Sequence, residues 1–327
     1  LTVSGQGTLV DDLDYNHRGQ LTSIERLGSW PDTIYTYYNQ SESFRLDEIQ
    51  HGVVDDAIPN FLYNQYDNLG NIERLQTQWS TESEDESETE AFEYDAVGRL
   101  TRAQETETSA YHYTYTYGAG GNLATRTNQQ MPPPNNVRTY TYGTPSNHHA
   151  HAVTAITGSL TATFEYDNNN AGNGNMTKRT ISGQVYTQEF DVENRLTKVT
   201  KVLTGDDQIA EFYYDVNGNR ILTIYKTGTT ETSRVYTPFP EYEKTVPTSG
   251  AATERSSYYL AGQLIAVRVK TGTSSDVRYF AYADHLGNVA AWTNGGSYFT
   301  DSLARYEPFG GYRTKPTSAA NPGISDR

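Results

Sequence analysis

A short pattern recurs about every 24 residues along the 327-residue chain, and it constrains the fold more than any other feature. The pattern is an aromatic residue, then Asp, Asn or Gly, two variable positions, Gly or Asn, a polar residue, and finally Leu or Ile. Clear copies begin at Tyr15, Tyr66, Tyr94, Tyr117 and Phe190, modified copies at Tyr166 and Tyr214, and weaker copies near Tyr38, Tyr142, Tyr236, Tyr258, Tyr282 and Tyr306. No linker or change of composition interrupts the series, so we expect one continuous array.

Each copy is typical of a β-hairpin turn. The aromatic residue ends one strand, and an aspartate such as Asp95 can hydrogen-bond the backbone two residues further on. Gly98 supplies a positive φ without steric cost, Asn194 is a tolerated substitute, and Leu100 begins the return strand. We assign this structural role to Tyr15, Gly19, Tyr66, Asp67, Gly70, Tyr94, Asp95, Gly98, Tyr117, Gly121, Tyr166, Asp167, Phe190, Asp191, Asn194, Tyr214, Asp215 and Gly218.

Strict alternation between the turns favours strands. Tyr111, Tyr113 and Tyr115 share one face of such a strand, while Thr114 and Thr116 share the other. No stretch of the sequence predicts a convincing helix. The predicted fold class is therefore all-β, a continuous array of antiparallel β-hairpins that curls into a spiral or barrel-like shell.

Composition excludes several kinds of protein. A hydrophobic content of 35% with a net charge of −15 would permit disorder, but the 27 tyrosines and the many threonines are strand formers. The absence of cysteine excludes disulfides and thiolate zinc sites. No apolar run approaches the ~18 residues that a membrane helix needs. The acidic balance argues against nucleic-acid binding. We expect no cofactor, no metal, no nucleic acid and no membrane span.

The turn pattern resembles the YD or Rhs repeats of bacterial Rhs polymorphic toxins, the Tc toxin C component and the teneurin shell. The stretch 279–313 strengthens the resemblance, because a DHLG motif there precedes a Y-[DE]-PFG motif, as in the Rhs-associated core. These motifs comprise Asp284, His285 and Gly287, then Tyr306, Glu307, Pro308, Phe309 and Gly310. The segments HAVTAI at 151–156 and NPGISDR at 321–327 are also similar to segments of the family. The resemblance covers residues 15–327.

The resemblance implies a division into a repeat array at 1–278 and a partial Rhs-associated core at 279–327, with no true boundary in the sheet. It implies a structural wall segment of a secreted or bacterial cell-surface toxin-type protein, which encapsulates or presents a C-terminal effector. The implied partners are the remaining parts of the polypeptide or that toxin cargo. The family's proteolytic aspartate motif does not occur before Arg327, so no cleavage residue is assigned, and we expect a fragment of a longer protein.

Two other functions stay open. A tyrosine-rich, acidic surface could serve as a cell-surface carbohydrate-binding or adhesion module, because tyrosine rings stack on sugars. A Tyr/His pair could also act as general acid and base in a polysaccharide lyase. The sequence selects no such pair, so the catalytic residues are unknown. We favour a scaffold over an enzyme.

Three clusters could carry chemistry, and for each the structural interpretation is favoured. His148, His149 and His151 have spacing that a metal loop could use. Asp284 and His285 could be an acid–base pair, but they belong to a turn motif. The segment 80–90 carries six carboxylates, Glu82, Glu84, Asp85, Glu86, Glu88 and Glu90, which could attract calcium. We expect that segment to be a solvated surface loop, because it lacks the spacing of a calcium loop.

Overall fold

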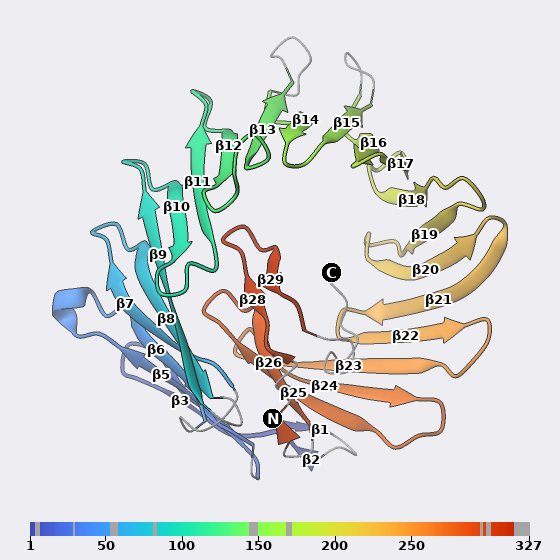
Figure 1. Cartoon of the computed structure of the whole chain (residues 1–327). Coiled ribbons are helices and arrows are strands. Elements are labelled where there is room, and N and C mark those ends of the chain that lie inside the picture. Colours follow the sequence, from blue (N-terminus) through green and yellow to red (C-terminus); the bar gives the residue numbers. More distant parts are fainter. Residues whose placement is uncertain are drawn as a thin grey trace. The chain divides into compact units, whose positions relative to one another are not determined.

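The computed structural model of the chain describes residues 1–3, 7–28, 30–52, 58–80, 84–143, 150–167, 172–294, 297–298 and 302–316. In this part of the chain almost every regular element is a strand, and the strands pair antiparallel with their sequence neighbours (Figure 1). The exception is one 3-10 turn, η1 (Gln40–Glu42). The expected all-β class and the array of antiparallel hairpins are confirmed.

The chain forms two compact units. Unit 1 comprises Leu1–Ala110, Ser256–Lys270 and Ser275–Arg327, and unit 2 comprises Tyr111–Arg255 and Thr271–Ser274. The first and last thirds of the sequence thus build one unit together, while the middle builds the other. The predicted division into a repeat array at 1–278 and a partial core at 279–327 is based on family motifs, whereas the two units are defined by compactness. That division therefore stays a prediction.

The strands of unit 1 come from both ends of the chain. They are β1 (Thr2–Val3), β2 (Gly7–Thr8), β3 (Val10–Tyr15), β4 (Leu21–Arg26), β5 (Thr33–Tyr37), β6 (Leu46–His51), β7 (Asn60–Tyr66), β8 (Ile72–Ser80), β9 (Asp85–Tyr94) and β10 (Leu100–Glu105), then β24 (Gln263–Thr271), β25 (Val277–Ala283), β26 (Val289–Asn294), β27 (Ser297–Tyr298), β28 (Arg305–Tyr306) and β29 (Tyr312–Thr314). The last residue of β24 belongs to unit 2.

In the part of the chain that the structure describes, unit 2 is a series of hairpins. Its strands are β11 (His112–Tyr117), β12 (Leu123–Asn128), β13 (Val137–Tyr142), β14 (Val153–Gly158), β15 (Ala162–Tyr166), β16 (Met176–Ile181), β17 (Gln184–Phe190), β18 (Leu196–Lys201), β19 (Gln208–Tyr214), β20 (Arg220–Thr227), β21 (Thr230–Phe239) and β22 (Tyr242–Pro247). The next strand, β23 (Thr253–Leu260), begins in unit 2 and ends in unit 1.

Repeat turns that carry Asp or Asn after the aromatic residue are closed by one set of hydrogen bonds, whereas the turn at Gly118 has only the backbone bonds. In the turn after β9, Asp95 Oδ1 accepts from the amides of Val97 and Arg99, both at 3.0 Å, and Oδ2 accepts from Arg99 Nε at 2.7 Å. Gly98 has a φ of +79°, and its amide donates to the Asp95 carbonyl. The strand register shifts by one residue beside this turn, so the β9–β10 hairpin carries a bulge.

The same geometry recurs at the other repeat positions. Asp67, Asp191 and Asp215 accept the corresponding amide bonds, and Asn16 does so in the first copy. Asn194 takes the glycine position with a φ of +61°. Where residues are inserted after Tyr166, Asp167 reaches instead to the amides of Asn173 and Gly174. Turn positions Gly19, Gly70, Gly121 and Gly218 all have positive φ.

A tyrosine ladder joins successive hairpins. In seven repeats the tyrosine that ends a strand donates its hydroxyl hydrogen to the carbonyl of the residue that begins the return strand of the preceding hairpin. These pairs are Tyr37–Leu21, Tyr66–Leu46, Tyr94–Ile72, Tyr142–Leu123, Tyr166–Val153, Tyr214–Leu196 and Tyr306–Val289, at oxygen–oxygen distances of 2.6–2.9 Å. The tyrosine of the repeat therefore links neighbouring hairpins as well as ending its own strand.

The hydrophobic core lies in unit 1. Strands β3–β8 from the start of the chain contribute Ile24, Ile49 and Tyr63, and strands β24–β26 contribute Ile265 and Phe280, all fully or almost fully buried. In unit 2 the strands β16–β18 contain only half-buried residues and one exposed one. Unit 1 is thus stabilised by a packed core, whereas much of unit 2 depends on its hydrogen-bonded sheet.

Candidate functional site: the C-terminal hairpins of unit 1

The two motifs of the predicted Rhs-associated core are two further repeat turns. Asp284 Oδ1 accepts from the amides of Leu286 and Asn288 at 2.8 and 2.9 Å, and Oδ2 accepts from Asn288 Nδ2 at 2.9 Å. Gly287 has a φ of +81°. This is the bonding pattern of Asp95, so the Asp284 carboxylate is committed to holding its turn.

The second motif folds in the same way. The Glu307 amide donates to the Gly311 carbonyl at 2.6 Å, and the Gly310 amide donates to the Glu307 carbonyl at 2.8 Å. Tyr306 occupies the tyrosine position of the ladder, and Phe309 lies exposed at the tip of the turn. Pro308 follows Glu307, where its fixed φ suits a turn.

His285 contacts a buried tyrosine instead of forming an acid–base pair with Asp284. Its Nδ1 lies 3.0 Å from the hydroxyl of Tyr63, and the two rings meet edge to face at 5.0 Å. Burial lowers the pKa of His285, and burial raises the pKa of Tyr63 far above its usual range. Both groups are therefore neutral near pH 7, and Tyr63 is fully buried. This arrangement suits a structural contact between β7 and the turn after β25.

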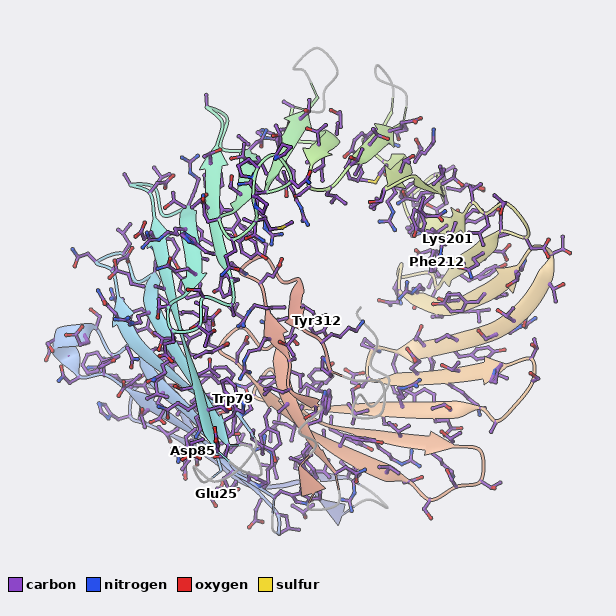
Figure 2. All side chains as sticks on the ribbon, in the orientation of Figure 1. Glu25, Trp79, Asp85, Lys201, Phe212 and Tyr312 are labelled. Atoms are coloured by element: carbon purple, nitrogen blue, oxygen red, sulfur yellow. The ribbon has the colours of Figure 1, made fainter. Side chains whose placement is uncertain are left out.

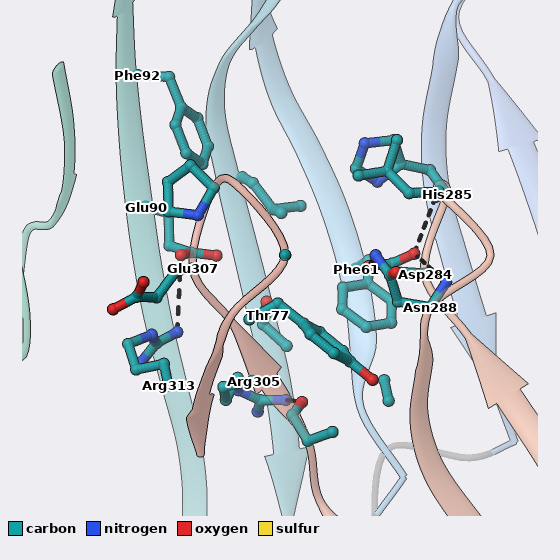
Figure 3. A pocket seen from close by; sticks show the side chains of 17 residues that line it. Phe61, Thr77, Glu90, Phe92, Asp284, His285, Asn288, Arg305, Glu307 and Arg313 are labelled. Carbon is teal, nitrogen blue, oxygen red and sulfur yellow. Dashed lines mark hydrogen bonds and ion pairs between the residues drawn. The ribbon is translucent and has the colours of Figure 1, made fainter. Parts of the chain in front are cut away.

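A pocket of about 210 Å³ lies beside these turns (Figure 3). Its apolar lining includes Phe61, Leu75 and Phe92 from β7–β9, and its charged lining includes Glu90 and Arg313. In Figure 3, His285 and Asp284 lie on one side of the pocket, and Glu307 and Arg313 lie on the other.

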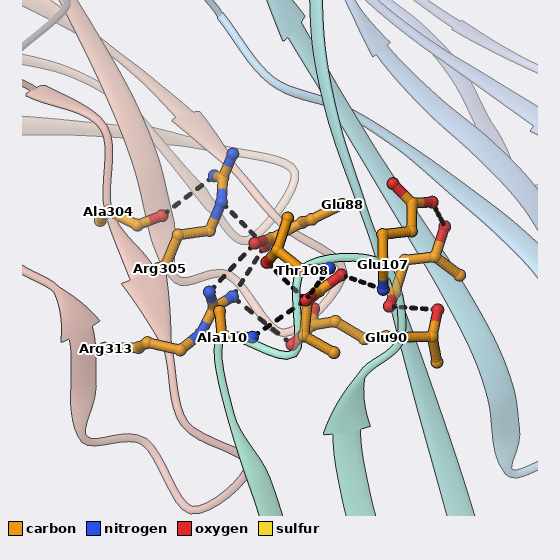
Figure 4. Close-up of polar contacts among 11 residues, drawn as sticks. Glu88, Glu90, Glu107, Thr108, Ala110, Ala304, Arg305 and Arg313 are labelled. Atoms are coloured by element: carbon orange, nitrogen blue, oxygen red, sulfur yellow. Dashed lines mark hydrogen bonds and ion pairs between the residues drawn. The ribbon is translucent and has the colours of Figure 1, made fainter. Parts of the chain in front are cut away.

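Buried ion pairs hold the last hairpin against β9 (Figure 4). The two guanidinium NH2 nitrogens of Arg313 contact the two Glu88 carboxylate oxygens at 2.7 and 3.0 Å. Arg305 Nε lies 3.0 Å from Glu88 Oε1, and its guanidinium lies 4.2 Å from the centre of the Trp79 ring. Glu88 and Arg305 are 8% and 6% exposed, so charges distant in sequence are buried together. Burial lowers the pKa of Arg305.

This finding corrects the expectation for the acidic segment 80–90. Asp85–Glu90 lie in strand β9, and Glu88 and Glu90 pair with arginines from the C-terminal hairpin, so a solvated loop is wrong for them. Glu84 and Glu86 are exposed, and Glu82 lies outside the described residues. Composition could not distinguish the paired carboxylates from the exposed ones, because all of them belong to one run of like charge.

A second buried carboxylate organises the chain after β10. Glu105 accepts hydrogen bonds from the amides of Glu107, Thr108 and Ala110 and from the Thr108 hydroxyl (Figure 4). Burial alone would raise the pKa of Glu105, but these hydrogen bonds outweigh it, and the pKa is lowered. Glu105 therefore remains ionised and fixes the segment 106–110.

Sequence reasoning missed a buried polar seam in the core of unit 1. Arg26 donates to the Ala281 carbonyl at 3.2 Å and lies over the ring of Tyr282. His51 bonds to Thr33 at 3.0 Å and to the Ala283 carbonyl at 3.1 Å. Arg26 and His51 each place a charged or polar side chain on the face of a strand that also carries a buried isoleucine. This break in the apolar–polar alternation is the only signal of the seam in the sequence.

The other predicted clusters are not assembled into a site by the described residues. His148 and His149 lie outside them, and His151 Nδ1 lies 2.8 Å from Asn122 Oδ1. No group of three metal-ligating side chains occurs in the described ranges. The tail segment 321–327 also lies outside them. Among the residues that the structure describes, none belongs to a helix long and apolar enough to span a membrane.

Comparison with known proteins gives similarity at the level of the fold. No family model and no curated relative matches the chain. The Photorhabdus luminescens Tc holotoxin pore matches 95% of the chain with a TM-score of 0.71 at 20% identity. The TcdB2-TccC3-TEV structure matches 100% with a TM-score of 0.74 at 18% identity. The chain has the YD-repeat shell fold. These structural matches confirm, at the level of the fold, the resemblance that the repeat pattern indicated.

The matched proteins are much longer. The chain spans 16% of the Tc holotoxin chain and 17% of the TcdB2-TccC3-TEV chain. A third similar structure, TcdB2-TccC3 without its hypervariable C-terminal region, matches 95% of this chain with a TM-score of 0.72 and 20% identity. The YD-repeat segment described here therefore corresponds to one part of a larger shell fold.

Proposed function

We propose that this chain is a wall segment of a hollow β-shell in a secreted or surface-exposed toxin-type protein, and that the shell encloses a C-terminal effector. The observation that carries the proposal is the match of 95–100% of the chain to Tc toxin shell structures with TM-scores of 0.71–0.74. The repeat turns and the tyrosine ladder support it, because hydrogen bonds of the ladder link neighbouring hairpins in seven repeats.

The buried contacts of unit 1 support the same role. Segments near both ends of the sequence pack into one core, and the pairs of Glu88 with Arg305 and Arg313 anchor the last hairpin. A wall segment must hold its shape while the rest of the polypeptide continues beyond it. The catalytic alternative has less support, because Asp284 is bound in a turn and Tyr63 is fully buried. The carbohydrate-binding alternative also has less support, because seven tyrosine hydroxyls already donate to backbone carbonyls.

Limited proteolysis of the full-length protein that carries this segment tests the proposal. The region downstream of the segment should resist protease in the native protein and be digested when it is expressed alone. Electron microscopy of the same sample should show a hollow particle. A solid particle with a freely digested downstream region would overturn the proposal.

A further inference from the structure

Charged side chains on strands β11–β21 of unit 2 are sorted between the two faces of the sheet. Residues directly opposite each other on paired strands share a face, and alternate residues of a strand lie on opposite faces. The register therefore assigns each side chain to a face. We call one face the ion-pair face and the other the cation face, as defined by the residues below.

The ion-pair face carries every carboxylate of these strands. They are Glu165, Glu189, Glu211 and Glu231, and the register of β15–β21 places them with Lys178, Lys198, Lys226 and Arg234. Each carboxylate pairs with one of these cations, at 2.6 Å for Glu165–Lys178, 2.9 Å for Glu189–Lys198, 2.7 Å for Glu211–Lys226 and 2.6 Å for Glu231–Arg234. The charges of this face compensate one another.

The cation face carries Arg126, Arg138, Arg179 and Lys201. Arg126 lies opposite Arg138, and Tyr186 lies opposite both Arg179 and Lys201. The described strands β11–β21 place no carboxylate on this face. Lys201 makes no ion pair with any described residue, and Arg179 lies over the Tyr186 ring, 4.9 Å from its centre. Although the chain has a net charge of −15, the described strands β11–β21 thus present one face that carries basic residues and no carboxylate.

Aromatic and aliphatic side chains lie between these cations. A groove of about 390 Å³ is lined by Arg179, Tyr186, Val199, Lys201, Ala210 and Tyr225. Phe212 shares the face next to Ala210, and Figure 2 labels Lys201 and Phe212 on the neighbouring strands β18 and β19. Tyr225 is 43% exposed. The groove therefore offers rings for apolar groups beside cations for carboxylates.

We propose that the cation face binds an extended acidic polypeptide. Lysine and arginine attract its carboxylates, while the rings and aliphatic groups accept its apolar side chains, which an unfolded chain leaves exposed. The ion-pair face attracts no such partner, because its charges already cancel. This inference rests on the proposed shell function and deepens it, since the effector enclosed by the shell would be such a polypeptide.

Two double variants of the full chain test the inference with identical changes of charge. Arg179→Glu with Lys201→Glu changes the cation face, and Lys178→Glu with Lys198→Glu changes the same strands, β16 and β18, on the ion-pair face. The probe is fluorescent poly-glutamate, and its affinity is measured by anisotropy over a salt series. Circular dichroism and scattering verify that each variant is folded.

Poly-glutamate should bind the wild-type chain more weakly as salt increases, and the cation-face variant should lose at least about tenfold in affinity. The ion-pair-face variant should stay within about threefold of wild type, since exposed pairs contribute little. Lys201→Gln, which removes one unpaired charge, should weaken binding by a smaller factor and provides the readout if the double variant does not fold.

Three results would overturn the inference: absence of binding, equal loss in both double variants, or tighter binding of dextran sulfate or single-stranded DNA than of poly-glutamate. The last result would assign the groove to a different polyanion. Each of these outcomes leaves the shell proposal standing, because protection of the downstream region and the hollow particle are measured separately.

Discussion

At the scale of the residue, the structure explains why the polar position after the turn glycine is so often Asn or Arg. Asn71, Asn219 and Asn288 donate their side-chain amides to Oδ2 of the turn aspartate, and Arg99 and Arg195 donate from Nε. Both residue types present a donor at the required reach. The aspartate is thereby bonded through both oxygens. Hydrogen bonds from the backbone amide of Arg99 or Arg195, and then from its side chain, lower the pKa of Asp95 and Asp191.

The tyrosine ladder predicts a measurable contribution from each hydroxyl. Tyr94→Phe removes the bond to the Ile72 carbonyl and should reduce the free energy of unfolding by about 1 kcal/mol. Tyr15→Phe is the control, because Tyr15 is exposed, and it should have little effect. Urea denaturation of both variants measures the difference. Equal midpoints would show that the ladder hydroxyls are dispensable.

His51 predicts a pH dependence of stability. Burial, with the nearby Arg26 charge, lowers the pKa of His51 from 6.5 to about 3. Between these two pH values the unfolded chain binds a proton at His51 and the folded chain does not. The contribution of neutral His51 to the free energy of unfolding is therefore fully present above pH 6.5 and is lost as the pH falls towards 3. His51→Gln should make the free energy of unfolding less dependent on pH within this window.

The exposed His17 provides the matched control for that measurement. His17→Gln should leave the slope of stability against pH unchanged between pH 6.5 and 4, when unfolding is followed by chemical denaturation at each pH. If His51→Gln leaves the slope as steep as in the wild type, proton uptake by His51 does not contribute to acid unfolding.

At the scale of the element, glycines in two different hairpins of unit 2 meet different steric demands. Gly158 ends β14 with a φ of +97°, and a Cβ at this position would overlap the Val137 carbonyl oxygen. Gly183, between β16 and β17, has a φ of +84° and open space around it. Gly183 is required by its backbone angle alone. Gly158 is required by its backbone angle and also by the close approach of strand β13.

The two glycines therefore predict unequal costs for the same substitution. Gly183→Ala should destabilise the protein by roughly 1–2 kcal/mol, the cost of left-handed backbone for an L-residue. Gly158→Ala should cost about 1–3 kcal/mol more, because the strands must move apart. Thermal unfolding of both variants provides the comparison, and equal losses would contradict the close approach.

The anchoring of the last hairpin predicts a large effect of one buried carboxylate. Glu88→Ala leaves Arg305 and Arg313 without their shared partner and should cost about 3–5 kcal/mol, the usual penalty for breaking a buried ion pair. Glu86→Ala, two residues earlier on the same strand, is exposed and should change stability by less than about 0.5 kcal/mol. Guanidinium denaturation measures both, and similar small effects would argue against the anchor.

At the scale of the whole molecule, the two units differ in how they are stabilised. Strands β25 and β26 of unit 1 are mostly buried, whereas β16 and β18 of unit 2 are half-buried throughout. Burial of apolar side chains stabilises the first unit, and repeated nearest-neighbour contacts stabilise the second. Regions with few buried contacts open at lower free energy than a packed core.

Hydrogen exchange should therefore distinguish the units. Amides of Phe280, Tyr282 and Ala291 should exchange more slowly than amides of Arg179, Thr187 and Val199, although all six lie in paired strands. Mass spectrometry of peptides from the native chain measures these rates. Equal protection would show that strand pairing, rather than core burial, sets the local stability.

The sequence by itself determined the all-β class, the hairpin array and the turn geometry. These depend on contacts within about ten residues, for which Asp, Gly and alternating Tyr are direct signals. The tertiary structure decided that Glu88 meets Arg305 and Arg313, that His285 meets Tyr63, and that Arg26 and His51 lie within the core. Those partners are separated by about 200 residues or more, so no local pattern records them. The separation of charges between the faces of unit 2 also depends on strand register, which bulges shift by one residue beside the repeat turns of β15–β16, β17–β18 and β19–β20.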